Sequence, residues 1–595
     1  MSWTTLAAGE GDPVAVTQSA DGTWTVETLP PTLDASGNVV ERNDVAPCIR
    51  DEDSPNPPPR SYYHMPFRIR IRLKWRFSRV TLRLRPSAVG CCVLCVLLLG
   101  ACHDDESVAP SAGPSHVIAI TSPVAYQTYQ RDGNGRADIT ISGTYADTPT
   151  AIEARFSGGG WSALDASPSA GSFSGTLSQQ RGQGTLEVRF ANDTTVMAAV
   201  RYVGIGDVFL VAGQSNASGR GNNNQGYTHA SLKASMYRED GRWAELTDVT
   251  DSDDGLGSPW PLLATRHMAD QGVPIAFVTA ADGGTGLVAP DANWSKNGTQ
   301  YRGLVNAINN SGINTAKAIL WHQGERDARN SVDQAAYQTA LSEMLDDLQG
   351  DLGGNFADLR LVCAQIGMSR LLDARQLDRV RLAQANRWDN DPDILAGPVL
   401  HDVDLSDGGG DGVHFRTDAE LQTLTDRWWR ALKYHFYGGT EPARGPRFGS
   451  ATHNGYQTTI TFTGGQGSLV NGTDVTGWAV TDANGTRTVL SASGTGDALT
   501  LTVDRVLVAP VLVTFGSGNT GAGATLRDSG TYPLPPEPFV GEPTKAPGSQ
   551  PGRDFLTQPE LIDRILTLLR RTATRPGRSR APPSGWTSPS AVASA

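Results

Sequence analysis

Residues 207–218 read DVFLVAGQSNAS, an apolar run over 207–212 that passes directly into a turn of small polar residues. Three more apolar runs of this kind lie at 274–279, 316–321 and 359–364. Short apolar runs without polar alternation are typical of strands buried on both faces of a sheet. Segments with helical periodicity lie between or after these runs, at 259–270, 333–348, 371–387 and 418–436. This alternation predicts an α/β domain over 206–437 with a doubly wound, mostly parallel sheet.

The last of these helices has a start signal of its own. Thr417 precedes the helical segment, and Glu420 follows three residues later. At this spacing each side chain accepts a hydrogen bond from the other residue's backbone N–H, which is the capping-box pattern. The pair predicts that a helix begins directly after Thr417.

Patterns typical of β-structure lie on both sides of the α/β domain. Over 116–205 and again over 446–540, apolar and polar residues alternate in short runs separated by turns. Alternation of this period predicts a β-sandwich in each region. Residues 103–115 are polar and are expected to form a linker. The tail over 541–595 is rich in Pro, Arg and Ser and is expected to be mostly disordered, with a peripheral helix at 558–571 as the alternative.

An export signal is predicted at 65–102. Basic residues recur over 68–85, an apolar run follows at 88–101, and Leu99-Gly100-Ala101 precede Cys102. The apolar run is shorter than the roughly 20 residues of a membrane-spanning helix, and the order of basic, apolar and small residues is that of a secretory signal. Its end resembles a bacterial lipobox, which implies a lipid anchor on Cys102 and a protein facing the periplasm or the cell exterior. A short buried helix, or ordinary cleavage before an incidental cysteine, is the alternative.

Residues 1–64 precede this signal, so we expect that translation begins at Met65 and that 1–64 is a mis-assigned or disordered extension. The cysteines agree with export. Four of them lie in the extension or the signal, which leaves only Cys102 and Cys363 in the mature chain. If Cys102 carries a lipid, no disulfide can form.

The composition argues against a nucleic-acid-binding protein and against a disordered chain. A chain of 595 residues suggests three or four domains at roughly 100–200 residues each. Lys and Arg total 50 against 62 Asp and Glu, and the net charge of −12 argues against nucleic acid as a general partner. Hydrophobic residues at 38% fit a globular chain rather than a disordered one. None of these values indicates an oligomeric state.

Polar clusters follow the predicted strands, at 213–219, 282–286 and 321–327. In doubly wound folds ligands bind beyond the carboxyl ends of the strands. Ser215 on a sharp turn would expose its hydroxyl, and the N–H groups that follow can stabilise an oxyanion. Gly283 and Gly284 let the backbone approach the same oxygen closely. A plain turn is the alternative at 213–219, whereas a nucleotide-binding loop at 282–286 would need G-x-G-x-x-G spacing, which is absent.

A carboxylate and an imidazole follow later, at Asp411 and His414. At this spacing they can share one turn, so that Asp411 holds the Nδ1–H of the imidazole and Nε2 takes a proton from a serine. Two rival sites are weaker. Glu325 and Asp327 as a glycosidase pair would point to opposite sides of an extended segment, and a calcium repeat at 408–411 would be a single copy. No metal or cofactor is expected.

Taken in order, four blocks resemble those of SGNH hydrolases: GQSN at 213–216, GGT at 283–285, HQGERD at 322–327 and DGVHF at 411–415. The branch that they resemble most is that of the sialate O-acetylesterases and acetylxylan esterases. The resemblance implies a flavodoxin-like, three-layer α/β fold between the two β-sandwiches. It implies Ser215 as the nucleophile, His414 as the general base and then acid, and Asp411 as its orienting carboxylate.

The resemblance also implies the neighbouring roles. The backbone N–H groups of Ser215 and Gly284, with the Gln323 side chain, would form the oxyanion hole. Gln214, Asn216 and Glu325 would support the site, Glu325 by bonding the serine loop or by orienting His414. Arg326 and Asp327 are expected to be structural.

The resemblance implies a serine esterase that removes O-acetyl groups from carbohydrates through an acyl-serine intermediate. The alternatives are an inactive glycan-binding surface lipoprotein and a general lipase or thioesterase. The presence of a serine, a histidine and an aspartate together favours an enzyme, because a binding protein needs none of the three as a set.

Overall fold

The computed structural model describes residues 14–18, 24–28, 116–250, 256–406 and 411–546. The chain forms two units, Met1–Ser107 and Val108–Ala595. In the first unit, β1 (Val14–Gln18) and β2 (Trp24–Thr28) pair as an antiparallel hairpin. The expected export signal with Cys102, the linker at 103–115 and the tail from 547 onward, with its alternative helix at 558–571, lie outside the described residues. The disorder expected from residue 541 is wrong at its start, because the strand β24 (Phe539–Pro543) runs past that position. Within the described part, no helix is long and apolar enough to cross a membrane.

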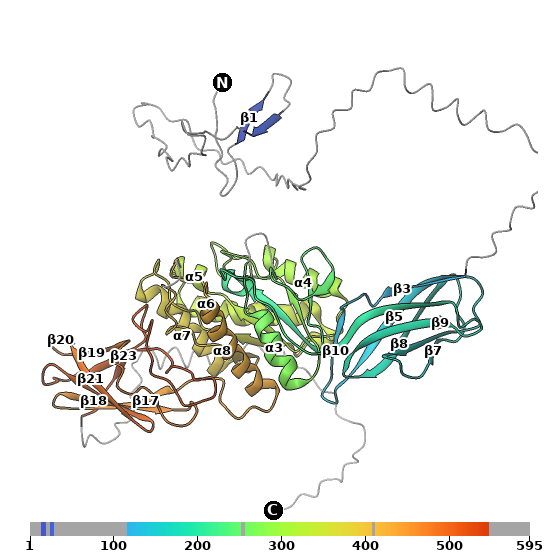
Figure 1. Ribbon diagram of the computed structural model, residues 1–595. Coiled ribbons are helices and arrows are strands. Elements are labelled where there is room, and N and C mark those ends of the chain that lie inside the picture. The colour runs from blue at the N-terminus through green and yellow to red at the C-terminus, as the bar shows by residue number, and fades with distance from the viewer. Residues whose placement is uncertain (1–13, 19–23, 29–115, 251–255, 407–410, 547–595) are drawn as a thin grey trace, which may run out of the picture. The chain divides into compact units, whose positions relative to one another are not determined.

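The second unit begins with a β-rich domain of two sheets (Figure 1). One sheet contains β3 (Val117–Ser122), β5 (Arg136–Ala146) and β8 (Ser172–Gln180). The other contains β7 (Ser162–Asp165), β6 (Ile152–Phe156), β9 (Gly182–Phe190) and the first part of β10 (Met197–Gly213), which also pairs with β4 (Thr128–Gln130). Alternate residues such as Ile139, Ile141 and Val188 are buried between the sheets, as the period-two pattern requires.

The strand β10 belongs to two domains at once. It runs antiparallel to β9 from Met197 to Ile205 and then, from Asp207, parallel to strands of the central sheet. The expected domain boundary between residues 205 and 206 therefore falls inside one continuous strand. Gly206 permits the passage, because a Cβ there would lie 1.9 Å from the carbonyl oxygen of Pro274.

The central sheet has seven strands in the order β12 (Trp243–Glu245), β11 (Ser235–Tyr237), β13 (Ile275–Thr279), β10, β14 (Ala318–His322), β15 (Leu361–Cys363) and β16 (Ile394–Ala396). All are parallel except β12. From β13 to β16 the chain order is 2-1-3-4-5, so the strand order reverses beside β10. A mixed α/β architecture with further β-rich domains is confirmed.

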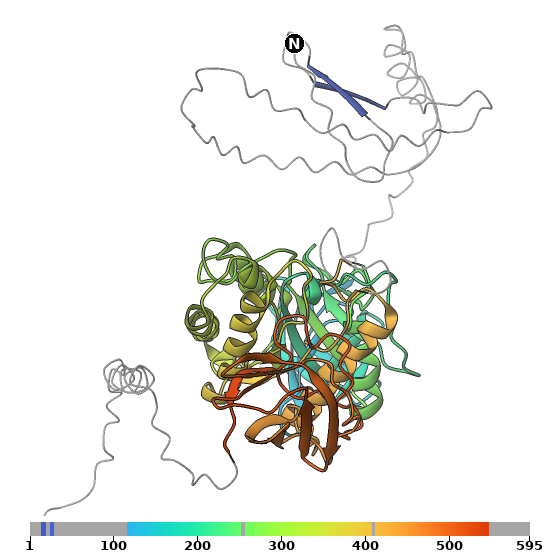
Figure 2. The ribbon, with the colours of Figure 1, turned by 90° about the vertical axis from the view of Figure 1, so that its left-hand side faces the viewer.

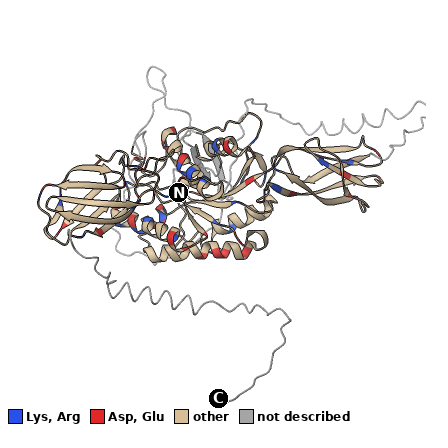
Figure 3. Cartoon of the chain, turned by 90° about the horizontal axis from the view of Figure 1, so that it is seen from below, with Lys and Arg blue, Asp and Glu red and all other residues tan. Residues whose placement is uncertain are grey.

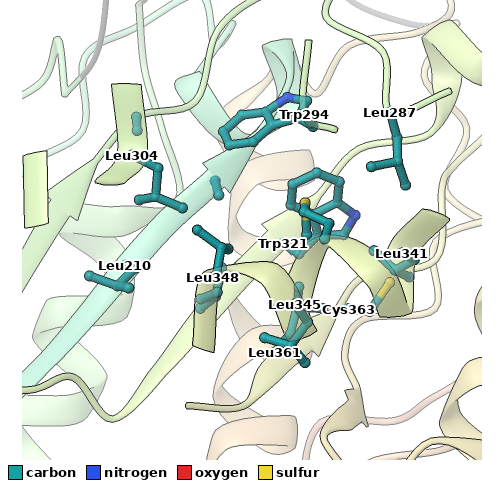
Figure 4. Packing of buried hydrophobic residues seen from close by; sticks show 14 of the residues in the cluster. Leu210, Leu287, Trp294, Leu304, Trp321, Leu341, Leu345, Leu348, Leu361 and Cys363 are labelled. Carbon is teal, nitrogen blue, oxygen red and sulfur yellow. The ribbon is translucent and has the colours of Figure 1, made fainter. Parts of the chain in front are cut away.

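Helices cover both faces of this sheet. On one face pack α4 (Thr299–Ser311), α6 (Gln334–Leu352) and α7 (Ala374–Asn390), and on the other α3 (Trp260–Gln271) and α8 (Asp418–Phe436). Figure 2 shows the yellow-green and orange helices on opposite sides of the sheet. Figure 4 shows the core between the sheet and α4, α6 and α7, where Trp294 and Trp321 lie above Leu345. The two indole rings are nearly perpendicular, with 5.1 Å between their centroids.

The predicted capping box at the start of α8 is confirmed. The backbone N–H of Glu420 donates to Thr417 Oγ1, and the backbone N–H of Thr417 donates to Glu420 Oε2. Glu420 Oε2 also accepts from the backbone N–H of Arg416, at 2.6 Å. The box therefore fixes the segment that immediately follows His414.

The described part of this unit ends in a second β-rich domain of two four-stranded sheets. The first has the order β17 (Arg447–Asn454), β18 (Gln457–Thr463), β22 (Ala498–Val503), β21 (Val489–Thr495), and the second β20 (Gly485–Arg487), β19 (Trp478–Asp482), β23 (Leu512–Phe515), β24 (Phe539–Pro543). The apolar run that begins at Val506 is a strand only from Leu512 onward, because Pro510 interrupts the backbone hydrogen bonding.

Acidic and basic residues are intermixed along the ribbon in Figure 3.

Candidate active site

Ser215 lies where β10 ends, in the first position of the one-turn helix α2 (Ser215–Ser218). The turn before it is sharp. Gly213 has a φ of 131°, and a Cβ there would lie 2.2 Å from the carbonyl oxygen of His322 on the neighbouring strand. Only glycine fits so close a passage, and it places the Ser215 side chain at the carboxyl edge of the sheet.

The structure brings Ser215, His414 and Asp411 together, although 199 residues separate the first two. His414 Nε2 lies 2.8 Å from Ser215 Oγ, and His414 Nδ1 lies 2.5 Å from Asp411 Oδ2. The turn itself is ordered by the aspartate, because Asp411 Oδ1 accepts from the backbone N–H groups of Val413 and His414 at 3.0 Å each. The imidazole is thus held between a hydroxyl and a carboxylate.

Electrostatics suit the imidazole to act as a base. Burial lowers the pKa of His414, and the hydrogen bond and charge of Asp411 offset this only in part. Burial acts to raise the pKa of Asp411, but hydrogen bonds from His414 and Arg416 outweigh it and hold that pKa well below its usual range. Arg416 Nη2 donates to Asp411 Oδ2 at 3.0 Å. At neutral pH the site therefore pairs a carboxylate with a neutral imidazole.

Two backbone N–H groups are available beside the hydroxyl. Ser215 and Gly284 both line the cavity described below, and no acceptor within the described part of the chain takes a hydrogen bond from either N–H. Gly284 has a φ of 71°, the left-handed conformation that favours glycine. Donors of this kind stabilise an oxyanion as it develops.

Gln323 requires a correction, because its side chain does not face the cavity. It is fully buried, and its Nε2 donates to the carbonyl oxygen of Thr285 at 3.1 Å and to the Asp327 carboxylate. Its Oε1 accepts from the Tyr337 hydroxyl at 3.0 Å. With both amide hydrogens committed, Gln323 braces the loop that carries Gly284 rather than donating to an oxyanion.

Gln214 and Asn216, on either side of the serine, tie its turn to other loops. Gln214 Oε1 accepts from the backbone N–H of Arg326 at 3.1 Å. Asn216 Nδ2 donates to the carbonyl oxygen of Val413 at 3.2 Å, and Asn216 Oδ1 accepts from the N–H of Phe415 at 3.3 Å. One amide therefore holds the residues on both sides of His414.

Glu325 bonds the serine loop, the first of its two expected roles. Its Oε1 accepts from Asn216 Nδ2 at 2.7 Å, and burial raises the pKa of its carboxyl. His322 lies beside it, with Nε2 at 3.8 Å from Glu325 Oε1. Burial lowers the pKa of His322 to about 3, so its ring is neutral.

Arg326 and Asp327 hold loops in place. Asp327 accepts from the backbone N–H groups of Leu287 and Val288 at 2.9 and 2.8 Å, which fixes the end of the Gly284 loop. Arg326 Nε donates to Asp291 Oδ2 at 2.6 Å. Arg416 and His322 are not among the predicted site residues, although both lie in or next to the quoted blocks.

A cavity of about 340 Å³ opens in front of the serine. Besides the residues already named, its lining includes Arg220, Asp282, Arg329, Ser369, Leu371 and Leu372. Within the described residues, no group of three or more His, Cys, Asp or Glu side chains is arranged to hold a metal ion. The lining is mixed, with guanidinium, carboxylate, hydroxyl and aliphatic groups, and so offers hydrogen bonds as well as an apolar surface.

The α/β fold with a serine, an imidazole and a carboxylate at its carboxyl edge is that of a hydrolase, and comparison with known proteins places it further. Residues 205–431 match the family model described as carbohydrate esterase, sialic acid-specific acetylesterase. The resemblance to sialate O-acetylesterases is thereby confirmed over this domain, and the matches support a hydrolase that acts on esters.

A probable carbohydrate esterase of Arabidopsis thaliana is 25% identical over 244 residues, which are 36% of this chain and 86% of that protein. A crystal structure of a carbohydrate acetylesterase from Xanthomonas citri aligns with 70% of this chain and 97% of its own, at 20% identity and a TM-score of 0.48. The X-ray structure of an Arabidopsis thaliana protein aligns with 39% of this chain and 98% of its own, at 22% identity and a TM-score of 0.33.

Proposed function

We propose that this protein is a serine esterase of the SGNH type that removes O-acetyl groups from carbohydrates. One observation carries the proposal: Ser215 Oγ, both nitrogens of the His414 ring and the Asp411 carboxylate form a continuous chain of hydrogen bonds, with steps of 2.8 and 2.5 Å. A buried hydroxyl has no need of such a chain for packing, whereas a nucleophile requires a base and an orienting group.

In the first step, Ser215 Oγ attacks the carbonyl carbon of the acetyl ester while His414 Nε2 takes the hydroxyl proton. The negative charge that develops on the carbonyl oxygen is stabilised by the N–H groups of Ser215 and Gly284. The carbon–oxygen bond to the sugar then breaks, and His414 returns its proton to the sugar oxygen. The sugar leaves with a free hydroxyl, and an acetyl group remains on Ser215.

In the second step, water replaces the sugar. His414 Nε2 removes a proton from the water as its oxygen attacks the acetyl carbonyl, and the same two N–H groups stabilise the charge. The bond to Ser215 breaks, the proton passes from His414 to Ser215 Oγ, and acetate leaves. Asp411 stays ionised throughout and stabilises the imidazolium of each step.

Two other functions compete with this one. An inactive glycan-binding protein would keep the cavity but not the hydrogen-bond chain. A general lipase or thioesterase would share the chain but act on longer acyl groups. The lining with Arg220, Asp282 and Ser369 supports a polar sugar over a lipid tail, because charged groups are costly to bury against hydrocarbon.

The test is acetate release from a panel of O-acetylated glycans, neutral and acidic, with p-nitrophenyl acetate and a long-chain p-nitrophenyl ester alongside. We expect acetate from the wild type and a loss of about 10⁶-fold in kcat for Ser215→Ala, the size of loss known for a serine-protease nucleophile. Ser218→Ala, in the same one-turn helix, is the matched control. Equal rates for the wild type and Ser215→Ala would overturn the proposal, and preference for the long-chain ester would favour a lipase.

We also propose that the protein is exported and anchored by a lipid on Cys102, with Met65 as the first translated residue. The support is the order of basic, apolar and small residues over 65–102. Mass analysis of the native protein is expected to find an acylated Cys102 at the N-terminus. The Cys102→Ala variant is expected to be soluble instead of bound to the membrane. A peptide from residues 1–64 in the mature protein would contradict it.

A further inference from the structure

A loop of the second β-rich domain, residues 516–521, reaches the wall of the cavity that contains Ser215. The amide of Asn519 brackets one residue of that wall, Ser369. The backbone N–H of Ser369 donates to Asn519 Oδ1 at 2.9 Å, and Asn519 Nδ2 donates to the carbonyl oxygen of Ser369 at 2.8 Å. Since Ser369, Leu371 and Leu372 line the cavity, this pair of hydrogen bonds fixes one side of it.

The same wall continues to the histidine turn. The backbone N–H of Arg370 donates to the carbonyl oxygen of Gly412 at 3.1 Å, between Asp411 and His414. Gly412 has a φ of 72°, and a Cβ there would lie 2.5 Å from the Arg370 side chain. The turn therefore has a support on each side, Asn216 on one and residue 370 on the other.

The loop that carries Asn519 is itself firmly seated on α7. Asp378 accepts from Ser517 Oγ at 2.6 Å and from the backbone N–H of Gly518 at 2.8 Å. The fully buried Arg381 donates from Nη1 to the carbonyl oxygen of Gly518 at 2.6 Å. It also donates from Nη2 to the carbonyl oxygen of Gly367 at 2.6 Å, so one guanidinium joins the loop to the segment after β15 that leads to Ser369.

From this arrangement we infer that Asn519 is a positioning residue for the ester-cleaving site. It acts through Ser369 and Arg370 on the turn that holds Asp411 and His414. The match to the esterase family model ends at residue 431, so this contribution comes from a domain beyond it. The inference rests on the proposed function, since it assigns Asn519 to the same chemistry.

The experiment compares full-length wild type, Asn519→Ala and a matched control, Thr520→Ala, on p-nitrophenyl acetate. Thr520 is exposed, and its hydroxyl bonds only within the loop, to the carbonyl oxygen of Ser517. The concentration of working sites is measured by titration with a serine-reactive phosphonate, and kcat is expressed per titrated site. A residue that only aids folding changes the titrated fraction, whereas a positioning residue changes kcat per site.

We expect Asn519→Ala to lose on the order of tenfold in kcat per titrated site, because small misplacements of reacting groups are costly, while its KM stays close to that of Thr520→Ala. A serine at position 519 cannot make both hydrogen bonds to Ser369 either. If Asn519→Ala does not fold, Asn519→Ser is therefore expected to show the same loss in kcat per titrated site. An unchanged kcat per site in both variants would overturn the inference. Failure of the proposed function looks different: the wild type would be inactive, or Ser215→Ala would be as active as the wild type.

Discussion

At the scale of single residues, the imidazole of His414 has one orienting partner and several groups that disfavour its charge. Burial comes first and lowers its pKa, and Arg416 and Arg220 act in the same direction. Among the main influences on the pKa of His414, only the Asp411 carboxylate favours the charged ring. The base therefore stays neutral, and competent to take a proton, to a lower pH than an ordinary histidine with its pKa of about 6.5.

The lowered pKa of His414 predicts the direction in which the pH dependence of the reaction shifts. For the wild type, the acid limb of kcat/KM is expected to have its midpoint below about 6.5, the ordinary imidazole value, since the free enzyme's base sets that limb. In Asp411→Asn the midpoint is expected to move lower still, because the charge that favours the imidazolium is gone. The maximal rate of this variant should fall by about 10⁴-fold, since an amide in this place favours the wrong tautomer.

Stopped assays of p-nitrophenyl acetate hydrolysis across the acidic range measure both effects. Asp404→Asn, which changes a carboxylate seven residues before Asp411 that accepts from the backbone N–H of Ser406, is the control and should leave the limb in place. A midpoint above the ordinary histidine value, or an unchanged rate in Asp411→Asn, would contradict the electrostatic account.

The sequence predicted which three side chains meet at the site, because each one follows a buried strand or lies in a short block that contains glycine. Ser215 directly follows β10, and Asp411 and His414 share one turn. Gln323 could not be placed in this way. Its position after β14 was predictable, but whether its amide faces the cavity or the core depends on Tyr337 and Asp327, which come from two helices. The direction of a side chain at a strand end is a tertiary property.

At the scale of elements, the sequence predicted the helices and strands that have a strong local signal and missed those that have a weak one. The helix α8 begins at Asp418, as the capping box predicts, and its buried face includes Leu421, Leu424 and Trp428. The strands β11, β12 and β16, of three residues each, were not predicted, whereas the equally short β15 lies inside the apolar run at 359–364. The helix α4 was missed, although Tyr301, Leu304 and Ile308 have helical spacing and are buried.

The capping box gives a prediction about stability. Thr417→Ala is expected to lower the free energy of unfolding by about 1 kcal/mol, because it leaves the Glu420 N–H without its partner at the helix start. Thr423→Ala removes a hydroxyl of the same helix that bonds only the carbonyl oxygen of Ala419, and should change stability by no more than a few tenths of that. Urea titrations of both variants measure the difference, and equal stabilities would show that the cap contributes nothing.

At the scale of the whole second unit, one buried carboxylate joins the first β-rich domain to the α/β domain. Asp207, on the shared strand β10, accepts two hydrogen bonds from Arg131 at 3.0 and 2.8 Å. It also pairs with His267 at 2.9 Å, Tyr437 at 3.0 Å and Lys317 at 3.2 Å. Burial acts to raise the pKa of Asp207, but the hydrogen bonds from His267 and Arg131 outweigh it and hold that pKa well below its usual range.

Asp207→Asn is therefore expected to cost about 3–5 kcal/mol of unfolding free energy, because it leaves Arg131 and Lys317 without their counter-charge. The matched control is Asp270→Asn, whose carboxylate pairs with Lys433 at a partly exposed site and should contribute less than about 1 kcal/mol. The contribution of Asp207 is present above the unfolded pKa of about 3.9 and is lost as the pH falls through its lower folded value. Thermal unfolding at neutral pH compares the two variants, and similar losses in both would contradict the role of Asp207.

The most direct measurement of the central claim is the detection of the covalent intermediate. The enzyme is mixed with p-nitrophenyl acetate, quenched in acid within the first turnovers, digested and analysed by mass spectrometry. We predict an acetyl group on the peptide that contains Ser215, absent from Ser215→Ala and accumulating too slowly to detect in His414→Ala. Hydrolysis that proceeds at the same rate with no acetyl group on Ser215, or with the group on another residue, would contradict the account.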